Sequence, residues 1–198
     1  MRFLLFVFFT SLGFCVEPSV ALKRLIEGNQ RYVEDHLAHP NRSTDRREAT
    51  VKKQKPFAVI VGCSDSRVPP EIIFDQGIGD LFIVRVAGNV VGPIELDSIE
   101  YAAKYLGSSC LFILGHEACG AVSAVLDGQT EDIEDIAKFI KPAIKGAKSV
   151  EEAVKDNVRW TVRRLKKTPV IRKLISQKKI TCVGGYYHLG SGKVEILK

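Results

Sequence analysis

Short apolar runs alternate along this chain with longer segments in which apolar residues recur at helical spacing. The runs that predict buried strands cover residues 57–62, 81–86, 110–114, 180–187 and, after the Gly190-Ser191-Gly192 turn, 194–197. The segments that predict helices cover residues 22–33, 94–106, 120–126, 131–145 and 149–167, with shorter helices after Pro69-Pro70 and at Pro169. This alternation indicates an α/β fold whose central, mostly parallel sheet is flanked by helices.

Two segments carry more local signals. Residues 36–55 are polar and basic, and they predict a loop that includes a short helix. Ser149 is followed three residues later by Glu152, which predicts a capping box at the start of the 149–167 helix. The sequence contains no internal repeat and no low-complexity segment.

The first fifteen residues are typical of a secretory signal peptide. Arg2 precedes the apolar stretch 3–9, and small residues follow toward Cys15. The stretch is shorter than the ~20 residues of a membrane-spanning helix. We therefore predict that residues 1–15 are removed, and that residues 16–198 form a single domain without stable membrane insertion. Export would most simply be to a bacterial periplasm; lipidation at Cys15 and a retained hydrophobic helix are the alternatives.

The composition fits a soluble globular protein with one sizeable core. Of the 198 residues, 45% are hydrophobic and 26% are charged. The formal net charge is +6, but the basic residues are scattered, and a local run at residues 163–167 is expected to be the solvated face of a helix. Because a nucleic-acid site needs clustered basic residues interleaved with stacking aromatics, we expect no nucleic-acid partner.

Five residues that could carry chemistry follow two of the predicted strands. Cys63, Asp65 and Arg67 follow the first run, and His116 and Cys119 follow the third. Ligands of open α/β sheets bind beyond the carboxyl ends of strands, so we expect these side chains to lie together. Two thiolates and one imidazole suit tetrahedral zinc and leave a fourth position for water or substrate, whereas a structural site fills all four. The pattern predicts a catalytic zinc site.

Asp65 and Arg67 extend the first motif beyond a single ligand. A carboxylate beside the metal accepts a hydrogen bond from bound water or hydroxide and orients it, and the guanidinium of Arg67 can hold Asp65 by a two-pronged contact. If that pair breaks, Asp65 can move onto the ion and close the site. Protonation of Asp65 or displacement of Arg67 would then change activity. A plain surface ion pair is the alternative.

Other chemistries for the cysteines fit the sequence less well. A phosphatase-type loop needs Cys-x5-Arg, and Pro69 stands at the arginine position. Cys63 and Cys119 do not form a Cys-x-x-Cys pair, which argues against a thioredoxin-like redox role. Cys110 and Cys182 lie in apolar runs and are expected to be buried free thiols, with a disulfide between them as the alternative.

The two motifs, Cys-Ser-Asp-Ser-Arg and Gly-His-x-x-Cys-Gly, resemble those of the beta-class carbonic anhydrases. The resemblance continues over residues 25–32, 84–89 and 157–197. It implies one Zn2+ per subunit held by Cys63, His116 and Cys119, with Asp65 and Arg67 as catalytic residues. It also implies a sheet of four parallel strands with an added C-terminal strand, and a homodimer or a tetramer of dimers. The implied reaction is the reversible hydration of CO2 to bicarbonate and a proton.

Some expectations remain open at this point. Hydrolysis of carbon disulfide or carbonyl sulfide on the same scaffold, and a non-catalytic zinc-binding module, are the alternative functions. The histidines at positions 36, 39 and 188 are candidate proton relays or ordinary surface residues. Some family members bind a second, inhibitory bicarbonate through Trp, Arg and Tyr. Arg85 and Tyr187 match two of those positions, but Ile60 stands at the tryptophan position and Trp160 lies elsewhere, so we expect that site to be absent or weak.

Overall fold

The computed structural model describes residues 16–198. The predicted signal peptide, with the candidate lipidation site Cys15, lies outside the described residues, so its removal and the export of the chain stay predictions. Within residues 16–198, no helix is both long enough and apolar enough to cross a membrane.

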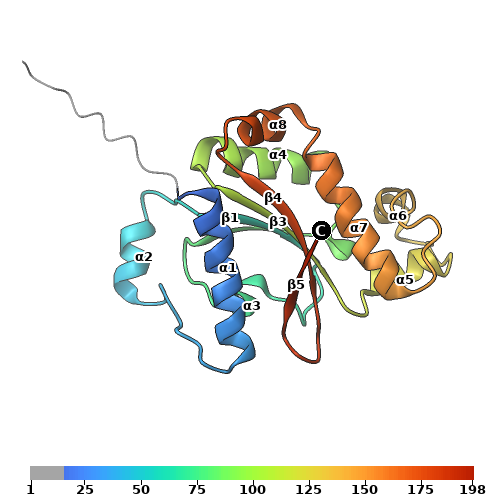
Figure 1. Ribbon diagram of the computed structural model, residues 1–198, viewed down its shortest axis with the longest axis horizontal. Coiled ribbons are helices and arrows are strands. Elements are labelled where there is room, and N and C mark those ends of the chain that lie inside the picture. Colours follow the sequence, from blue (N-terminus) through green and yellow to red (C-terminus); the bar gives the residue numbers. More distant parts are fainter. Residues whose placement is uncertain (1–15) are drawn as a thin grey trace, which may run out of the picture.

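A five-stranded sheet forms the centre of the structure (Figure 1). Its strands are β1 (Ala58–Gly62), β2 (Leu81–Arg85), β3 (Cys110–His116), β4 (Thr181–Tyr187) and β5 (Val194–Leu197). They lie in the order β2-β1-β3-β4-β5; β1 to β4 run parallel to one another, and β5 is antiparallel to β4. The prediction of four parallel strands with an added C-terminal strand is confirmed.

The strand order reverses between β1 and β3. From β1 the chain crosses to β2 on one side, returns to β3 on the other side of β1, and continues to β4. The carboxyl ends of strands at such a switch point are where open α/β sheets bind ligands. The register pairs Gly62 with Leu114, so the residues that follow these two positions emerge side by side.

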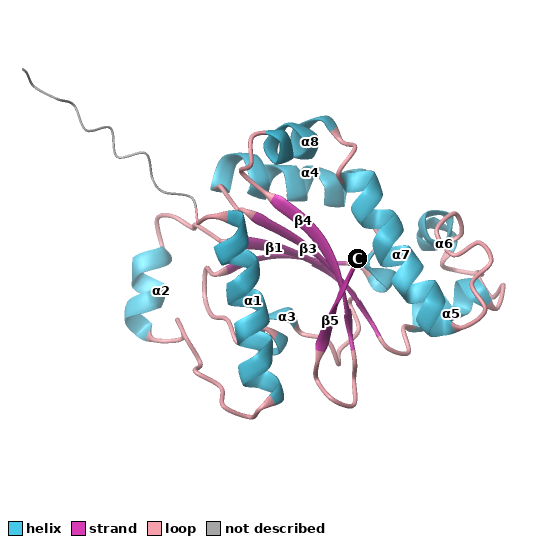
Figure 2. Cartoon of the chain, viewed as in Figure 1, coloured by secondary structure: helices cyan, strands magenta, loops and turns pink. Residues whose placement is uncertain are grey.

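Helices cover both faces of the sheet (Figure 2). They are α1 (Pro18–Val33), α2 (Thr44–Thr50), α3 (Pro70–Ile73), α4 (Pro93–Tyr101), α5 (Gly120–Leu126), α6 (Glu134–Ile140), α7 (Val150–Leu165) and α8 (Pro169–Ser176). A 3-10 turn (Ala87–Asn89) follows β2, and a π-helical turn (Ala102–Leu106) follows α4. Helix α1 packs on β3 and β4 from one side, and α7 packs on the same strands from the other.

Glycines allow α7 to approach the sheet closely. A Cβ at Gly115 would lie 2.6 Å from a methyl carbon of Val158 and 2.8 Å from one of Val154. A Cβ at Gly184 would lie 2.5 Å from Val158. Such separations are too short for van der Waals contact, so only glycine lets this helix pack directly on the backbone of β3 and β4.

The segment predicted to be helical over residues 131–145 forms a helix only at α6. Asp132 has a φ of 62°, in the left-handed region, so a helix cannot begin before it. Pro142 has no N–H with which to continue the hydrogen-bond ladder beyond Ile140. Apolar spacing thus identified the residues that face the core, such as Ala137 and Ile140, but it did not identify the ends of the helix.

The capping box predicted for α7 is displaced by one residue. Ser149 caps the helix as expected, because its hydroxyl accepts a hydrogen bond from the N–H of Glu152 at 3.1 Å. The Glu152 carboxylate accepts from the N–H of Lys148 at 2.8 Å rather than from Ser149. The N–H groups of Lys148 and Glu152 are thus both satisfied by side chains, and the signal identified the correct helix start.

Asp75 is a buried charge just after α3. That helix cannot continue through Asp75, which turns the chain into the left-handed region with a φ of 43°. Its carboxylate accepts from Nε of Arg31 at 2.7 Å and from the N–H groups of Ala38 and His39 at 2.9 and 3.1 Å. Burial alone would raise the pKa of Asp75, but these hydrogen bonds outweigh burial and hold the pKa below its usual value. The carboxylate therefore ties α1 and the loop after it to α3.

Candidate metal centre

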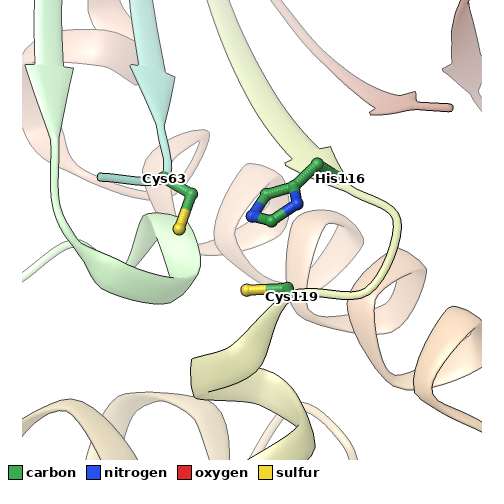
Figure 3. Close-up of side chains that lie close together, drawn as sticks. All are labelled: Cys63, His116 and Cys119. Carbon is green, nitrogen blue, oxygen red and sulfur yellow. The ribbon is translucent and has the colours of Figure 1, made fainter. Parts of the chain in front are cut away.

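The three predicted metal ligands lie together at the carboxyl end of the sheet. Cys63 directly follows β1, His116 is the last residue of β3, and Cys119 is the N-cap residue of α5. The two sulfur atoms and one ring nitrogen of His116 lie within 4.8 Å of one another, and all three residues are buried. Figure 3 shows the three side chains directed toward a common point between them.

The tautomer of His116 is fixed by a main-chain carbonyl. Nδ1 lies 2.8 Å from the carbonyl oxygen of Glu117, which can only accept, so Nδ1 carries the proton. Nε2 is then unprotonated and carries a free lone pair. It is buried and has no hydrogen-bond partner among residues 16–198. A buried ring nitrogen whose lone pair has no hydrogen-bond donor is stabilised by a group that accepts the lone pair, as a metal ion does.

The two sulfur atoms differ in acidity when no cation is bound. A hydrogen bond from the Cys119 thiol lowers the pKa of Cys63 to about 4, against the opposing effect of burial. The N–H of Gly88 also donates to the Cys63 sulfur, at 3.3 Å. The same hydrogen bond, together with burial, raises the pKa of Cys119. The pair thus holds one proton and one negative charge, and a cation would favour loss of the remaining proton.

These donors fit a tetrahedral zinc ion. Zinc binds thiolate sulfur at about 2.3 Å and imidazole nitrogen at about 2.0 Å, so the ligand atoms around one ion lie roughly 3.5 Å apart. Atoms within 4.8 Å of one another need to move by only about 1 Å to share an ion of this kind. Coordination requires a proton on Nδ1 of His116, a free lone pair on its Nε2 and a Cys63 thiol that ionises readily. These are the states found here.

Asp65 and Arg67 form the two-pronged pair that the sequence suggested. Nε of Arg67 donates to Oδ1 at 2.9 Å and Nη2 donates to Oδ2 at 2.7 Å. These hydrogen bonds hold the pKa of Asp65 far below its usual value. Oδ2 also lies 3.9 Å from Nε2 of His116, so the carboxylate borders the three ligands. Arg67 reaches the second ligand loop as well, through the carbonyl of Ala118 at 3.3 Å.

Arg85 holds the first ligand loop from β2. Its Nε donates to the carbonyl of Cys63 at 2.8 Å, and its Nη2 donates to the carbonyl of Asp65 at 2.6 Å. The Tyr187 hydroxyl is likewise engaged, 3.2 Å from that of Tyr32. Both residues that match the second bicarbonate site of the family therefore have partners within the chain. These contacts agree with the prediction that this site is absent or weak, which stays a prediction.

The main-chain contacts of Gly88 at the site were not foreseen from the sequence. Gly88 has a φ of 67° and places its N–H against the Cys63 sulfur. The buried Asn157 of α7 donates to the Gly88 carbonyl at 2.9 Å and fixes that turn. A Cβ at Gly88 would lie 2.8 Å from Ile140. The Ala-Gly-Asn turn after a predicted strand was the signal, because glycine is favoured where φ is positive and the backbone passes close to other atoms.

The candidate proton relays lie outside this cluster. His36 and His39 are exposed in the loop after α1, and the Nε2 of His188 lies 3.5 Å from a carboxylate oxygen of Glu195. Within residues 16–198, none of the three is hydrogen-bonded or ion-paired to a metal ligand or to Asp65. The structure therefore gives no direct contact through which they would relay a proton.

Cys110 and Cys182 are buried free thiols, as predicted. They lie on neighbouring strands, but Cys110 is paired with Thr181 and Cys182 with Leu111. Burial raises the pKa of each thiol to about 12. Both stay protonated near neutral pH and act as small apolar residues of the core.

Comparisons with known sequences agree with the geometry. The sequence model of the carbonic anhydrase family matches residues 58–194. A carbonic anhydrase of Mycolicibacterium smegmatis is 38% identical over 191 residues, which cover 90% of this chain and 93% of the relative. Carbonic anhydrase 2 of Mycobacterium tuberculosis is 40% identical over 188 residues, which cover 89% of this chain and 91% of the relative.

Solved structures show the same fold. The beta-carbonic anhydrase CafA of Aspergillus fumigatus superposes with a TM-score of 0.71 at 26% identity, over 91% of this chain and 90% of the other. The beta-carbonic anhydrase of Coccomyxa, solved with acetazolamide, gives a TM-score of 0.67 at 25% identity, over 89% of this chain and 86% of the other. Fold, motifs and relatives therefore point to one family.

Proposed function

The chain belongs to the beta-class carbonic anhydrase family of enzymes, and from this premise we propose that it catalyses the reversible hydration of carbon dioxide with one zinc ion per subunit. The observation that carries the proposal is the buried cluster of Cys63, His116 and Cys119, in which the Nε2 lone pair faces two sulfur atoms. The names of the mycobacterial relatives support the same activity.

Zinc is the ion that this donor set favours. Thiolate and imidazole ligands select zinc over magnesium or calcium, which prefer oxygen. When bound, the ion would act as a Lewis acid and make a water molecule acidic enough to supply hydroxide near neutral pH. Residues 16–198 bring three ligands together at this point, as catalytic zinc sites do, rather than the four of a structural site.

Asp65 is the residue that would orient the attacking oxygen. Its side chain is 17% exposed and Oδ2 borders the ligands, so it can accept a hydrogen bond from an oxygen held there. Arg67 keeps the carboxylate ionised and in one direction, because both oxygens are bound by the same planar guanidinium. A fixed acceptor directs the free lone pair of the attacking oxygen toward the carbon of CO2.

Arg85 and Gly88 would keep the first ligand loop in place during turnover. The guanidinium of Arg85 spans the carbonyls of Cys63 and Asp65, which places a ligand and the orienting carboxylate in one rigid unit. The N–H of Gly88 satisfies one lone pair of the Cys63 sulfur. A hydrogen bond to a thiolate ligand draws charge from the sulfur, and this makes the site more electrophilic.

We further propose that the protein works as a homodimer or as a tetramer of dimers. One structural neighbour, from Sordaria macrospora, is described as tetrameric. In this chain β2 is an edge strand, and the neighbouring Tyr101 and Tyr105 are 47% and 67% exposed. Phe82 of β2 contacts the ring of Tyr101, so the exposed rings continue the apolar edge. A second copy would cover this surface, and sedimentation as a monomer would overturn the proposal.

Stopped-flow CO2 hydration by the purified protein tests the proposed activity, with zinc quantified in the same preparation. We expect hydration well above the buffer rate and one zinc ion per chain. Protein that holds zinc stoichiometrically but does not hydrate CO2 would overturn the proposal. Carbon disulfide and carbonyl sulfide belong in the same assay, because turnover of either without CO2 hydration would identify the alternative hydrolase, and no turnover at all would identify a non-catalytic zinc module.

Export is proposed from residues 1–15 alone. We expect the mature chain to be recovered from the periplasmic fraction of the cells that produce it, with its N-terminus near residue 16. Recovery of the full-length chain from the cytoplasm would contradict this.

A further inference from the structure

The loop between two of the proposed ligands holds His116 through a main-chain carbonyl. The Glu117 carbonyl oxygen lies 2.8 Å from Nδ1, and this contact decides which nitrogen is free to bind a metal. That hydrogen bond opposes rotation of the ring about its Cβ–Cγ bond. The direction of the Glu117 carbonyl therefore controls the direction of the Nε2 lone pair.

That carbonyl belongs to a peptide group held in an unfavourable conformation. Ala118 has a φ of 51°, in the left-handed region that residues with a Cβ rarely adopt. Rotation of the peptide between Glu117 and Ala118 would relieve this conformation and turn the carbonyl away from the ring. Strained backbone of this kind persists where the surrounding contacts hold it in place.

Glu117 makes two such contacts. Its main-chain N–H donates to the carbonyl of Tyr187, the last residue of β4, at 2.9 Å. Its carboxylate oxygen Oε2 accepts from the N–H of Leu189, in the turn between β4 and β5, at 2.9 Å. The residue is thus fixed at its N–H and at its side chain, while its carbonyl holds His116.

The turn that receives the carboxylate is itself rigid. Buried Asn29 of α1 donates to the Gly192 carbonyl at 2.8 Å and accepts from the N–H of Val194 at 2.8 Å. Across the turn, the N–H of His188 donates to the Lys193 carbonyl, and the N–H of Gly192 donates to the His188 carbonyl, both at 2.9 Å. The N–H of Leu189, which faces Glu117, is therefore held in position by contacts from α1 and from the ends of β4 and β5.

We propose that Glu117 is a positioning residue of the metal centre, whose carboxylate anchors the ligand loop 116–119 to the β4–β5 turn and so fixes the tautomer and direction of His116. The inference rests on the proposed zinc site. Glu117 itself is exposed, so its side-chain hydrogen bond contributes little to folding. Its effect is on how long the metal stays bound.

Three variants of the full-length protein test this role. E117A removes the carboxylate, E117Q keeps an oxygen that can accept from Leu189, and E131A removes an exposed carboxylate in the turn before α6 as a matched control. The measurements are the rate at which zinc passes to an excess of a coloured chelator, the visible spectrum of the cobalt-substituted protein, and thermal unfolding of the metal-free protein.

We expect E117A to release zinc about tenfold faster than the wild type, because loss of a partner that orients a ligand typically costs 10- to 100-fold in metal affinity. Its cobalt spectrum shifts, while its metal-free unfolding temperature matches that of E131A. E117Q and E131A release zinc at close to the wild-type rate.

Two results would overturn the inference alone. The first is a rate of zinc release from E117A within twofold of the rate from E131A, with an unchanged cobalt spectrum. The second is an equal increase in the release rate in E117Q and E117A, which would assign the effect to the charge of Glu117. Wild-type protein that binds no zinc would instead overturn the proposed function, and the inference with it.

Discussion

Arg67 binds both carboxylate oxygens of Asp65, with Nε 2.9 Å from Oδ1 and Nη2 2.7 Å from Oδ2. The N–H of Arg67 adds a third hydrogen bond to Oδ1, at 2.9 Å. These three hydrogen bonds lower the pKa of Asp65 far below its usual range, so the carboxylate is ionised at every pH at which the protein is expected to work. The pair therefore supplies a fixed direction rather than a titrating group.

Replacing Arg67 should lower activity without changing its dependence on pH. In R67A the pKa of Asp65 rises only toward its ordinary value of about 4, so the group stays ionised from pH ~6 to ~9. We expect kcat/KM to fall by about 100-fold, because the carboxylate loses its direction. Stopped-flow hydration across that range, with R172A of α8 as an exposed control, measures this. A new acid limb in R67A would show that protonation of Asp65 matters.

Asp75→Asn should destabilise the fold and make its free energy of unfolding less dependent on pH in the acidic range. The substitution removes a buried carboxylate that accepts from Arg31, Ala38 and His39, and we expect a loss of about 2–4 kcal/mol in the free energy of unfolding.

The sign of the pH effect follows from the lowered pKa of Asp75 in the folded state. Its contribution is complete above the unfolded pKa of about 4 and is lost as pH falls through the folded value. Urea unfolding at neutral and acidic pH should show a shallower loss of stability in acid for D75N than for the wild type, with D127N, at an exposed aspartate, as the control. Equal slopes in D75N and the wild type would contradict the assignment.

Metal-free protein should carry one thiolate near neutral pH. The hydrogen bond from Cys119 lowers the pKa of Cys63 to about 4, whereas burial raises the pKa of Cys110 and Cys182 to about 12. Ultraviolet absorbance of chelator-treated protein should therefore show one thiolate per chain that protonates in acid. C63S should show none, and C119A should protonate at higher pH because the donor is gone. A wild-type chain with no thiolate near neutral pH would refute this.

Gly115→Ala should destabilise the protein through α7. The new methyl group would lie 2.6 Å from Val158 and 2.8 Å from Val154, so the helix must move away from β3. Overpacking of this kind typically costs about 1–3 kcal/mol. Urea unfolding measures the change, and Gly190→Ala, where a Cβ meets no atom within 4 Å, should change stability by less than about 0.5 kcal/mol. An equal loss in both variants would count against the close-packing argument.

The sequence predicted the parts of the site that local patterns determine. The run Ala58–Val61 is apolar at every position because β1 is buried on both faces, and this placed Cys63 at the end of an inner strand. The same holds for β3 and His116. Residue types then predicted a metal site, and parallel pairing accounts for the convergence of the two loops.

The parts that depend on register and on distant turns were not predicted. Arg85 reaches the carbonyls of Cys63 and Asp65 only because β2 pairs with β1 so that Gly62 faces Arg85. Glu117 meets Leu189 only because β4 ends beside β3 and a turn follows it. Neither contact leaves a periodic signal, since each joins one side chain to the backbone of a separate segment.

The reversal of strand order between β1 and β3 also determines when the proposed metal ion could first bind during folding. During synthesis Cys63 leaves the ribosome before His116 and Cys119 do. It meets them only after β2 has been synthesised and β3 has paired with β1. Chains with an incomplete or misaligned sheet present only scattered donors to the ion. The proposed zinc ion would therefore be bound only by correctly assembled molecules, and the zinc content of a preparation would report their fraction.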